Sequence, residues 1–128
     1  MPALALDHYN LRADHALTEA LCRFYVDVIG MRIGARPAFN FPGFWLYLGD
    51  QPVLHLVEVP ETEIRSAQAR GTFDHVAFAC EDRAAFEAHL AQCGVPYRRS
   101  LIPGTPVCQL FLTDPAGNGV ELNFASGA

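Results

Sequence analysis

The sequence lacks the features that would place the protein in a membrane or on a nucleic acid. No apolar run approaches the roughly 20 residues that a membrane-spanning helix needs. Basic clusters are also absent, since Arg98 and Arg99 are the only adjacent basic pair and the formal net charge is −5. Binding to nucleic acid or to an anionic membrane is therefore not expected.

The cysteines do not form a recognisable motif. No two of them make a CxxC pair, so neither a zinc knuckle nor a redox site is predicted. The first ten residues, MPALALDHYN, have neither the basic segment nor the apolar stretch of a signal peptide. We therefore expect a cytoplasmic protein in which the thiols are small, reduced core residues. The four are Cys22, Cys80, Cys93 and Cys108.

An internal repeat organises the chain. The first half opens with LDHYNL and the second with FDHVAF, and both alternate as strands do, with a histidine at the same place. Each opening is followed by a helical stretch that ends near a glycine, and then by three extended pieces. The 128 residues therefore predict one α+β domain of two tandem βαβββ modules. We place module one at about 4–60, a polar linker at 60–71 and module two at about 72–125.

The helices have predictable ends. Asp14 or Thr18 is a suitable N-cap for the first, and Asp82 for the second. Gly94 is expected to end the second helix. We expect His15 in the loop before the first helix and His89 on an exposed helix face.

Strand alternation puts a set of polar side chains on one face. His8, His75 and Glu121 lie on three different strands. In each of these strands, the face opposite the His or Glu side chain is apolar and should lie against the helices. Neutral imidazole and carboxylate are good ligands for divalent metals, and they are costly to bury without a partner. The sequence thus predicts a metal site formed by His8, His75 and Glu121. We include His55 as a fourth candidate ligand. Because the strand of His55 is apolar on both faces, a core imidazole remains an alternative there.

These segments resemble a known family. The pieces that carry the resemblance are LDH at the start, FYVDVIGM, FDHVAF and LTDPAGNGVELNF, the last of which is similar to a D-P-x-G-x-x-x-E signature. Over about residues 4–125 the chain resembles the glyoxalase/bleomycin resistance/dioxygenase superfamily, also called vicinal oxygen chelate. The resemblance implies a half-open barrel around one divalent metal, which could be Zn, Ni, Co, Fe or Mn. Its ligands would be His8, His55, His75 and Glu121, and the protein would be a homodimer.

The resemblance also narrows the chemistry. In this family two neighbouring oxygens of the substrate bind the metal as a chelate, and the metal stabilises the negative charge that develops. Four protein ligands favour proton transfer, as in isomerases and lyases, with Glu121 as the base. Arg12 matches a position at which glyoxalase I binds the carboxylate of glutathione. His55 and Val59 replace the Glu and Asn of that enzyme, however, so glutathione recognition is doubtful.

Third-strand alternation predicts an aromatic pocket. Leu46, Leu48, Leu110 and Leu112 should face the helices, which leaves the alternate residues on the concave side. Such a pocket suits a small, oxygenated, hydrophobic or aromatic substrate. An alternative is that the Phe-rich loop only packs a dimer interface. The expected substrate-binding residues are Arg12, Phe39, Phe41, Phe44, Trp45, Tyr47, Arg98, Gln109, Phe111 and Asn123.

Three classes of function follow from these residues. The leading one is a divalent-metal-dependent isomerase or lyase of glyoxalase I-like type. The second is an iron-dependent extradiol-type dioxygenase, which would need only the two-His, one-carboxylate set His8, His75 and Glu121. The third is a non-catalytic drug-binding resistance protein, which has no need of the ligands.

Overall fold

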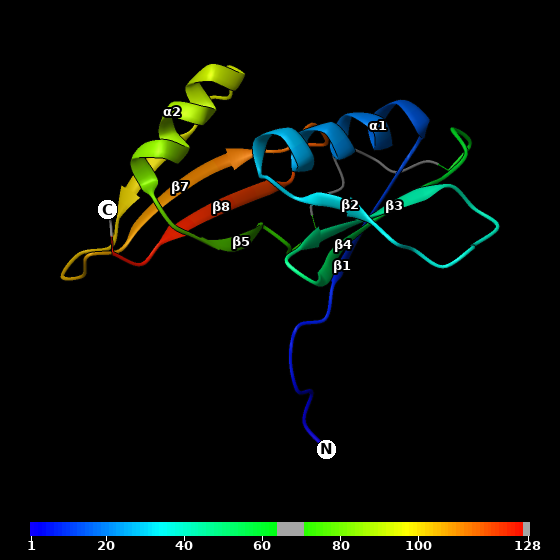
Figure 1. Cartoon of the computed structure of the whole chain (residues 1–128), viewed down its shortest axis with the longest axis horizontal. Coiled ribbons are helices and arrows are strands. Elements are labelled where there is room, and N and C mark those ends of the chain that lie inside the picture. Colours follow the sequence, from blue (N-terminus) through cyan, green and yellow to red (C-terminus); the bar gives the residue numbers. More distant parts are fainter. Residues whose placement is uncertain (64–70, 127–128) are drawn as a thin grey trace. The chain divides into compact units, whose positions relative to one another are not determined.

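Two compact units make up the chain. A computed structural model describes residues 1–63 and 71–126. The chain divides into Met1–Ser66 and Ala67–Ala128, and each unit is a four-stranded sheet with its own helix (Figure 1). Most of the predicted linker lies outside the described residues. No helix in the described part of the chain is long and apolar enough to cross a membrane.

Module one has its first and last strands side by side, with the first strand at one edge of the sheet. The sheet order is β1-β4-β3-β2, with β1 and β4 parallel and the other pairs antiparallel. A π-helical turn, η1, extends the helix. The elements are β1 (Tyr9–Ala13), α1 (His15–Arg23), η1 (Phe24–Val28), β2 (Arg32–Gly34), β3 (Gly43–Leu48) and β4 (Gln51–Glu58).

Module two repeats this topology. Its order is β5-β8-β7-β6, and β5 and β8 are again the parallel pair. The predicted fold class, two tandem βαβββ modules, is therefore confirmed. The elements are β5 (His75–Cys80), α2 (Arg83–Cys93), β6 (Arg98–Leu101), β7 (Cys108–Thr113) and β8 (Gly119–Phe124).

Each sheet buries one face against its own helix. In module one, α1 contacts β1, β3 and β4, and Leu46, Leu54 and Leu56 are almost completely buried. In module two, Leu110 and Leu122 are fully buried, and the α2 residue Phe86 packs edge-on against Phe124 of β8. The alternation in the sequence therefore separates a helix-facing side from the opposite side of each sheet.

The helix ends follow the expected capping chemistry. The Asp14 carboxylate accepts a hydrogen bond from the Leu17 backbone N–H at 3.0 Å, and Asp82 does the same for Ala85 at 3.2 Å. Gly94 ends α2 with φ +67°, a conformation that favours glycine. His15 is not in a loop, because the Asp14 cap makes it the first residue of α1.

Two side-chain environments differ from the prediction. Cys22 and Cys108 are buried as expected, but Cys93 is exposed because it lies in the last turn of α2, away from the sheet. Leu48 is also exposed, because a register shift between Leu46 and Leu48 takes it off the helix-facing side. All four cysteines are free.

Candidate metal centre

Each module begins with an aspartate–histidine pair. His8 lies immediately before β1 and His75 is the first residue of β5. The Nδ1 atom of His8 lies 2.6 Å from Asp7 Oδ2, and that of His75 lies 2.7 Å from Asp74 Oδ2. A carboxylate that accepts from Nδ1–H leaves Nε2 with the lone pair, which is the arrangement of many metal-binding histidines.

The second candidate ligand of each module follows from the strand register. In module two, His75 is opposite Gly119, and Glu121 lies two residues further along β8. In module one, Tyr9 is opposite Leu54 and Asn10 is opposite His55, so the position opposite His8 would be Val53. His55 therefore occupies the same place relative to His8 as Glu121 does relative to His75.

The module-two pair is close and polar. His75 Nε2 lies 3.2 Å from Glu121 Oε1. Glu121 is only 5% exposed, and its Oε2 accepts hydrogen bonds of 3.2 Å from the amides of Gln109 and Asn123. The hydrogen bond that His75 donates to Asp74 is the main cause that raises the pKa of His75, and the charge of Glu121 adds to it. The amides leave Oε1 as the oxygen that faces the histidine.

The module-one pair is stacked and apolar. The His55 ring lies between those of His8, at 3.8 Å between centroids, and Trp45, at 4.1 Å. His55 is 8% exposed, and its buried Nε2 has no hydrogen-bond partner. Burial first and the neighbouring His8 second lower the pKa of His55, so the imidazole is held neutral.

The predicted aromatic residues separate into two groups. Trp45 stacks on His55, and Phe39 lies 6.3 Å from Trp45 and 4.8 Å from Phe41. Phe44 alternates with Trp45 along β3 and is paired with Leu56, so it belongs to the other face of the sheet.

Tyr47 shares the face of Trp45, but its hydroxyl group is already engaged. It donates a hydrogen bond to the Ala35 carbonyl, and its ring lies under the guanidinium of Arg32. We therefore infer that Tyr47 holds β2 and β3 together at this end of the sheet.

Arg36, which lies near the aromatic group, was not predicted from the sequence. The Arg36 guanidinium lies 4.9 Å from the centroid of the Phe39 ring and 5.2 Å from that of Phe41. Its charge also contributes to the lowered pKa of His55. The only sequence signal for it is its position just before the unusual Phe-rich loop.

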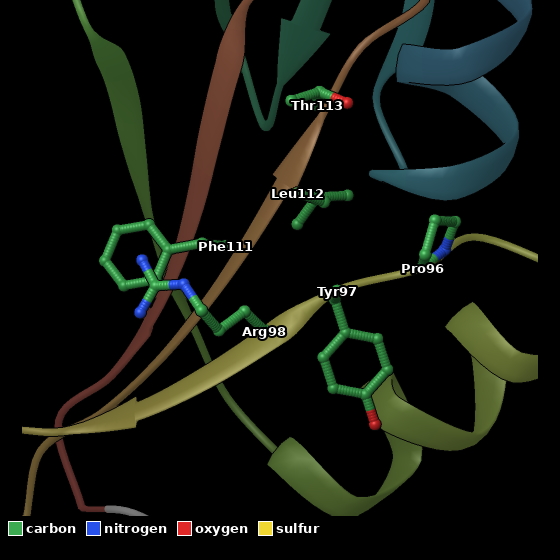
Figure 2. A pocket seen from close by; sticks show the side chains of 6 residues that line it. All are labelled: Pro96, Tyr97, Arg98, Phe111, Leu112 and Thr113. Atoms are coloured by element: carbon green, nitrogen blue, oxygen red, sulfur yellow. The ribbon is translucent and has the colours of Figure 1, made fainter.

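The two other predicted arginines have different surroundings. Arg12 shares the β1 face of His8, but its guanidinium forms an ion pair with Glu63 at 2.7 Å. Arg98 lies 4.6 Å from the centroid of Phe111, whose ring is edge-on to His75. Arg98, Phe111 and Tyr97 are among the residues that line a hollow of about 320 Å³, and the Tyr97 hydroxyl donates a hydrogen bond to Glu87 of α2 (Figure 2).

The D-P-x-G-x-x-x-E segment is a turn that positions Glu121. Asp114 is 4% exposed, and its carboxylate accepts hydrogen bonds of 2.9 Å from the backbone of Ala116 and Asn118 and from the Asn118 side chain. Gly117 has φ +86°, which the turn needs. Gly119 then passes so close to β5 that a Cβ there would lie 2.9 Å from His75 Cβ.

Together, these positions give two pairs. Within residues 1–63 and 71–126, no group of three or more His, Cys, Asp or Glu side chains is gathered as a cation would require. Module one brings together His8 and His55, and module two brings together His75 and Glu121. Each pair supplies half of the predicted ligand set.

The chain has similar relatives among known proteins. The family model described as "Glyoxalase/Bleomycin resistance protein/Dioxygenase superfamily" matches residues 5–122. A protein named "Glyoxylase I 4" from Arabidopsis thaliana is 35% identical over 104 residues, which is 77% of this chain. The chain spans 59% of the length of that relative.

Solved structures with the same fold include both enzymes and binding proteins. A lactoylglutathione lyase from Agrobacterium tumefaciens has a TM-score of 0.70 at 22% identity, covering 98% of this chain and 97% of that one. An antibiotic binding protein from Streptomyces sp. CB03234 has a TM-score of 0.71 at 21% identity, covering 98% and 99%. At these identities the likeness establishes the fold alone.

Proposed function

The chain belongs to the glyoxalase/bleomycin resistance protein/dioxygenase superfamily, and from that premise we propose that it is a divalent-metal-dependent lyase or isomerase. Its chemistry is proton transfer on a small oxygenated substrate with a hydrophobic or aromatic part. The observation that carries this proposal is the pair formed by His75 and Glu121, with Nε2 left available by Asp74.

The module-two pair suits a divalent cation. Two ligand atoms at about 2.1 Å from one metal lie about 3.0 Å apart at a right angle and about 3.4 Å apart at the tetrahedral angle. The 3.2 Å between His75 Nε2 and Glu121 Oε1 falls between these values. The Asp74 contact has the form of the outer carboxylate that commonly orients a metal-binding histidine.

The module-one pair could bind the same cation if the His8 ring rotates. The lone pairs of imidazole nitrogens lie in the ring plane, and the planes of His8 and His55 differ by only 15°. Stacked rings do not point at a shared atom, so the more exposed His8 ring must turn. The buried, unpartnered Nε2 of His55 favours this assignment, because a metal would satisfy it. We therefore propose His8, His55, His75 and Glu121 as the ligand set.

Glu121 is the proposed base. A bound divalent cation supplies a Lewis acid that chelates neighbouring substrate oxygens and stabilises the negative charge left when a proton departs. Gln109 and Asn123 hold Oε2, so Oε1 is the oxygen that would coordinate the cation and that, on leaving it, would take the proton from the substrate and return it. Arg98, stacked on Phe111 beside His75, would bind a polar group of the substrate.

The test combines metal content with two reactions. Protein purified without chelator is expected to hold about one divalent ion for each set of four ligands. It should catalyse deuterium exchange from D₂O at the carbon next to the carbonyl of an aryl α-hydroxyketone, without oxygen uptake on catechols. Metal at full occupancy in the His75→Ala variant would contradict the ligand assignment.

A second candidate function has an observation of its own. If His55 stays between His8 and Trp45, the remaining ligands are His8, His75 and Glu121, the set that suits non-haem iron. Oxygen uptake on catechols with Fe²⁺, unaffected by His55→Gln, would identify an extradiol-type dioxygenase. A His55 nitrogen at about 2.0–2.1 Å from the metal would identify the four-ligand site instead.

The protein is further proposed to be a homodimer. Among the described residues, the outer strands of each sheet pair with one neighbour within that sheet, and they are β1 and β2 in module one and β5 and β6 in module two. Open edges are usually covered by another chain or element. Sedimentation should therefore give twice the chain mass of 14.0 kDa, and a strict monomer at micromolar concentration would contradict the dimer.

A further inference from the structure

Module one carries a cluster of one half-buried arginine and two exposed phenylalanines, which we call the Arg36 cluster (Arg36, Phe39 and Phe41). The Nε atom of Arg36 is buried and has no hydrogen-bond partner. The two phenylalanine rings are stacked 4.8 Å apart and 14° from parallel. They are 42% and 38% exposed, although large apolar rings are normally buried. The Arg36 guanidinium lies within about 5 Å of both ring centroids, at 4.9 and 5.2 Å.

The loop that carries the cluster is held in place by hydrogen bonds to its backbone carbonyl groups. Arg36 Nη2 donates a hydrogen bond to the Phe41 carbonyl, and Pro42 accepts one from the backbone of Glu58. Gly43 is required by the close approach of the β4 backbone, because a Cβ there would clash with the Leu56 carbonyl oxygen, and Arg36 Nη2 would be a further neighbour at 3.2 Å. A prearranged surface of this kind loses little conformational freedom when a ligand binds.

The charge of Arg36 is not neutralised by the protein. Arg12, Arg83 and Arg99 all lie within 4 Å of a glutamate oxygen. In the described part of the chain, no carboxylate lies within that distance of Arg36. Among the described residues Arg36 shares this lack of an acidic neighbour with Arg23, Arg32 and Arg98, but it is the one that lies against two exposed phenylalanine rings. An anionic ligand would supply the missing acidic neighbour.

The cluster is continuous with the candidate ligands. Phe39 lies 6.3 Å from Trp45, and Trp45 stacks on His55, which stacks on His8. A row of rings thus leads from the Arg36 cluster to the two histidines of module one. A ligand bound at the cluster would have its other end directed along this row.

We propose that the Arg36 cluster binds the planar anionic end of the substrate, an aryl carboxylate. The carboxylate pairs with the Nη end of the Arg36 guanidinium, because Nε is buried and Nη2 shares its hydrogens with the Phe41 carbonyl. The aryl ring packs against the exposed parts of Phe39 and Phe41. This assignment deepens the proposed function by naming the substrate class. The binding step itself requires no metal.

Trp45 is a built-in reporter for this binding. It is the only tryptophan of the chain and its ring is 6.3 Å from that of Phe39, so its fluorescence should change when the cluster is occupied. The probes are benzoate, the neutral benzamide of similar shape, and cyclohexanecarboxylate, which has the charge without the flat ring. Each is titrated into chelator-treated full-length protein and again after one equivalent of zinc is added.

The charge and the rings are tested separately. Benzoate should bind about tenfold more tightly than either other probe, with or without zinc. Arg36→Gln should remove the preference over benzamide, and Arg36→Lys should restore part of it. Phe39→Leu with Phe41→Leu should remove the preference over cyclohexanecarboxylate. Arg32→Gln is the matched control, since Arg32 also stacks on a ring and donates to a backbone carbonyl in the same module.

The outcomes separate this inference from the proposed function. Equal binding of the three probes, or the same loss in Arg32→Gln as in Arg36→Gln, overturns the Arg36 cluster as a subsite. Fluorescence that changes with protein concentration alone, and is unmoved by benzoate, means that a second copy covers the cluster and also overturns it. Benzoate preference in a protein that never binds metal would sustain the subsite and defeat the metalloenzyme.

Discussion

The two modules place their candidate ligands in the same register but surround them differently. In module two, Gln109 and Asn123 lie where they can donate to the Glu121 carboxylate. Strand pairing puts Gly43 and Val57 at the equivalent positions of module one, where there is no donor, and His55 is instead enclosed by rings. The repeat therefore sets where a candidate ligand lies, and the neighbouring strand sets whether amide donors or aromatic rings surround it.

Removing a ligand from either pair should have the largest effect. Zinc bound by four ligands is worth about 10–16 kcal/mol, so one ligand carries about 3 kcal/mol, or more than about a hundredfold in affinity. Chelator competition should show this loss in each variant, and His15→Ala, which changes an exposed histidine, should show none. The variants are His8→Ala, His55→Ala, His75→Ala and Glu121→Ala.

The same series can break the symmetry between the modules. If only His55→Ala keeps wild-type affinity, module one contributes His8 alone and the three-ligand set is correct. If His8→Ala and His55→Ala both keep wild-type metal affinity, module one contributes no ligand to a metal site.

The turns that precede β8 and β4 should differ in their effect on stability. Asp114→Ala removes three hydrogen bonds to a buried carboxylate and should lower the free energy of unfolding by about 2–3 kcal/mol. Asp50, in the shorter turn between β3 and β4, is exposed, so Asp50→Ala should cost less than about 0.5 kcal/mol. Urea unfolding measures both, and equal losses would mean that the Asp114 contacts contribute little.

The close approach of β8 to β5 gives a smaller effect. Gly119→Ala should destabilise the fold by about 1–2 kcal/mol, because the new Cβ would lie 2.5 Å from the Asp74 carbonyl oxygen and 2.9 Å from His75 Cβ. Gly71→Ala is the control, since its Cβ would meet nothing within 4 Å. The corresponding position of module one holds Val53. A neutral Gly119→Ala in urea unfolding would therefore show that both modules tolerate a side chain there.

The smallest effect concerns the first residue of each helix. The hydrogen bond to Glu58 is the main cause that raises the pKa of His15 above its ordinary value. Because the folded-state pKa is the higher one, the stabilisation is complete below about pH 6.5 and disappears as the pH rises through the raised value. The unfolding midpoint of His15→Gln should thus fall below wild type at pH 5.5 and match it at pH 9.

Module two supplies the comparison for that pH dependence. Arg83 occupies the equivalent place after the Asp82 cap and lies 3.6 Å from Glu87, but arginine stays charged throughout this range. Arg83→Gln should therefore change the midpoint equally at both pH values. A pH-dependent difference in this variant, and none in His15→Gln, would contradict the assignment of the effect to the His15–Glu58 pair.

The sequence alone determined the repeat, the two βαβββ modules and the faces of most strand residues, with Leu48 an exception because of a register shift. These depend on the alternation of side chains every second residue and on caps such as Asp14 and Gly94, which are local properties of the chain. His8 and His75 could be named as candidates because each follows an aspartate at the start of a module. Arg36 was not named, since its only sequence signal is its position just before the Phe-rich loop, which a solvated surface arginine could also occupy.

Only the tertiary structure decided what each candidate touches. The stack of His8, His55 and Trp45 and the amide contacts of Glu121 join residues from different strands, so their geometry depends on register and on side-chain rotation. An alternating pattern fixes the face of a strand but not the partner across it. That is why His55 could be assigned to a face from the sequence, while its burial between two rings, with Nε2 unpartnered, became visible only in the folded module.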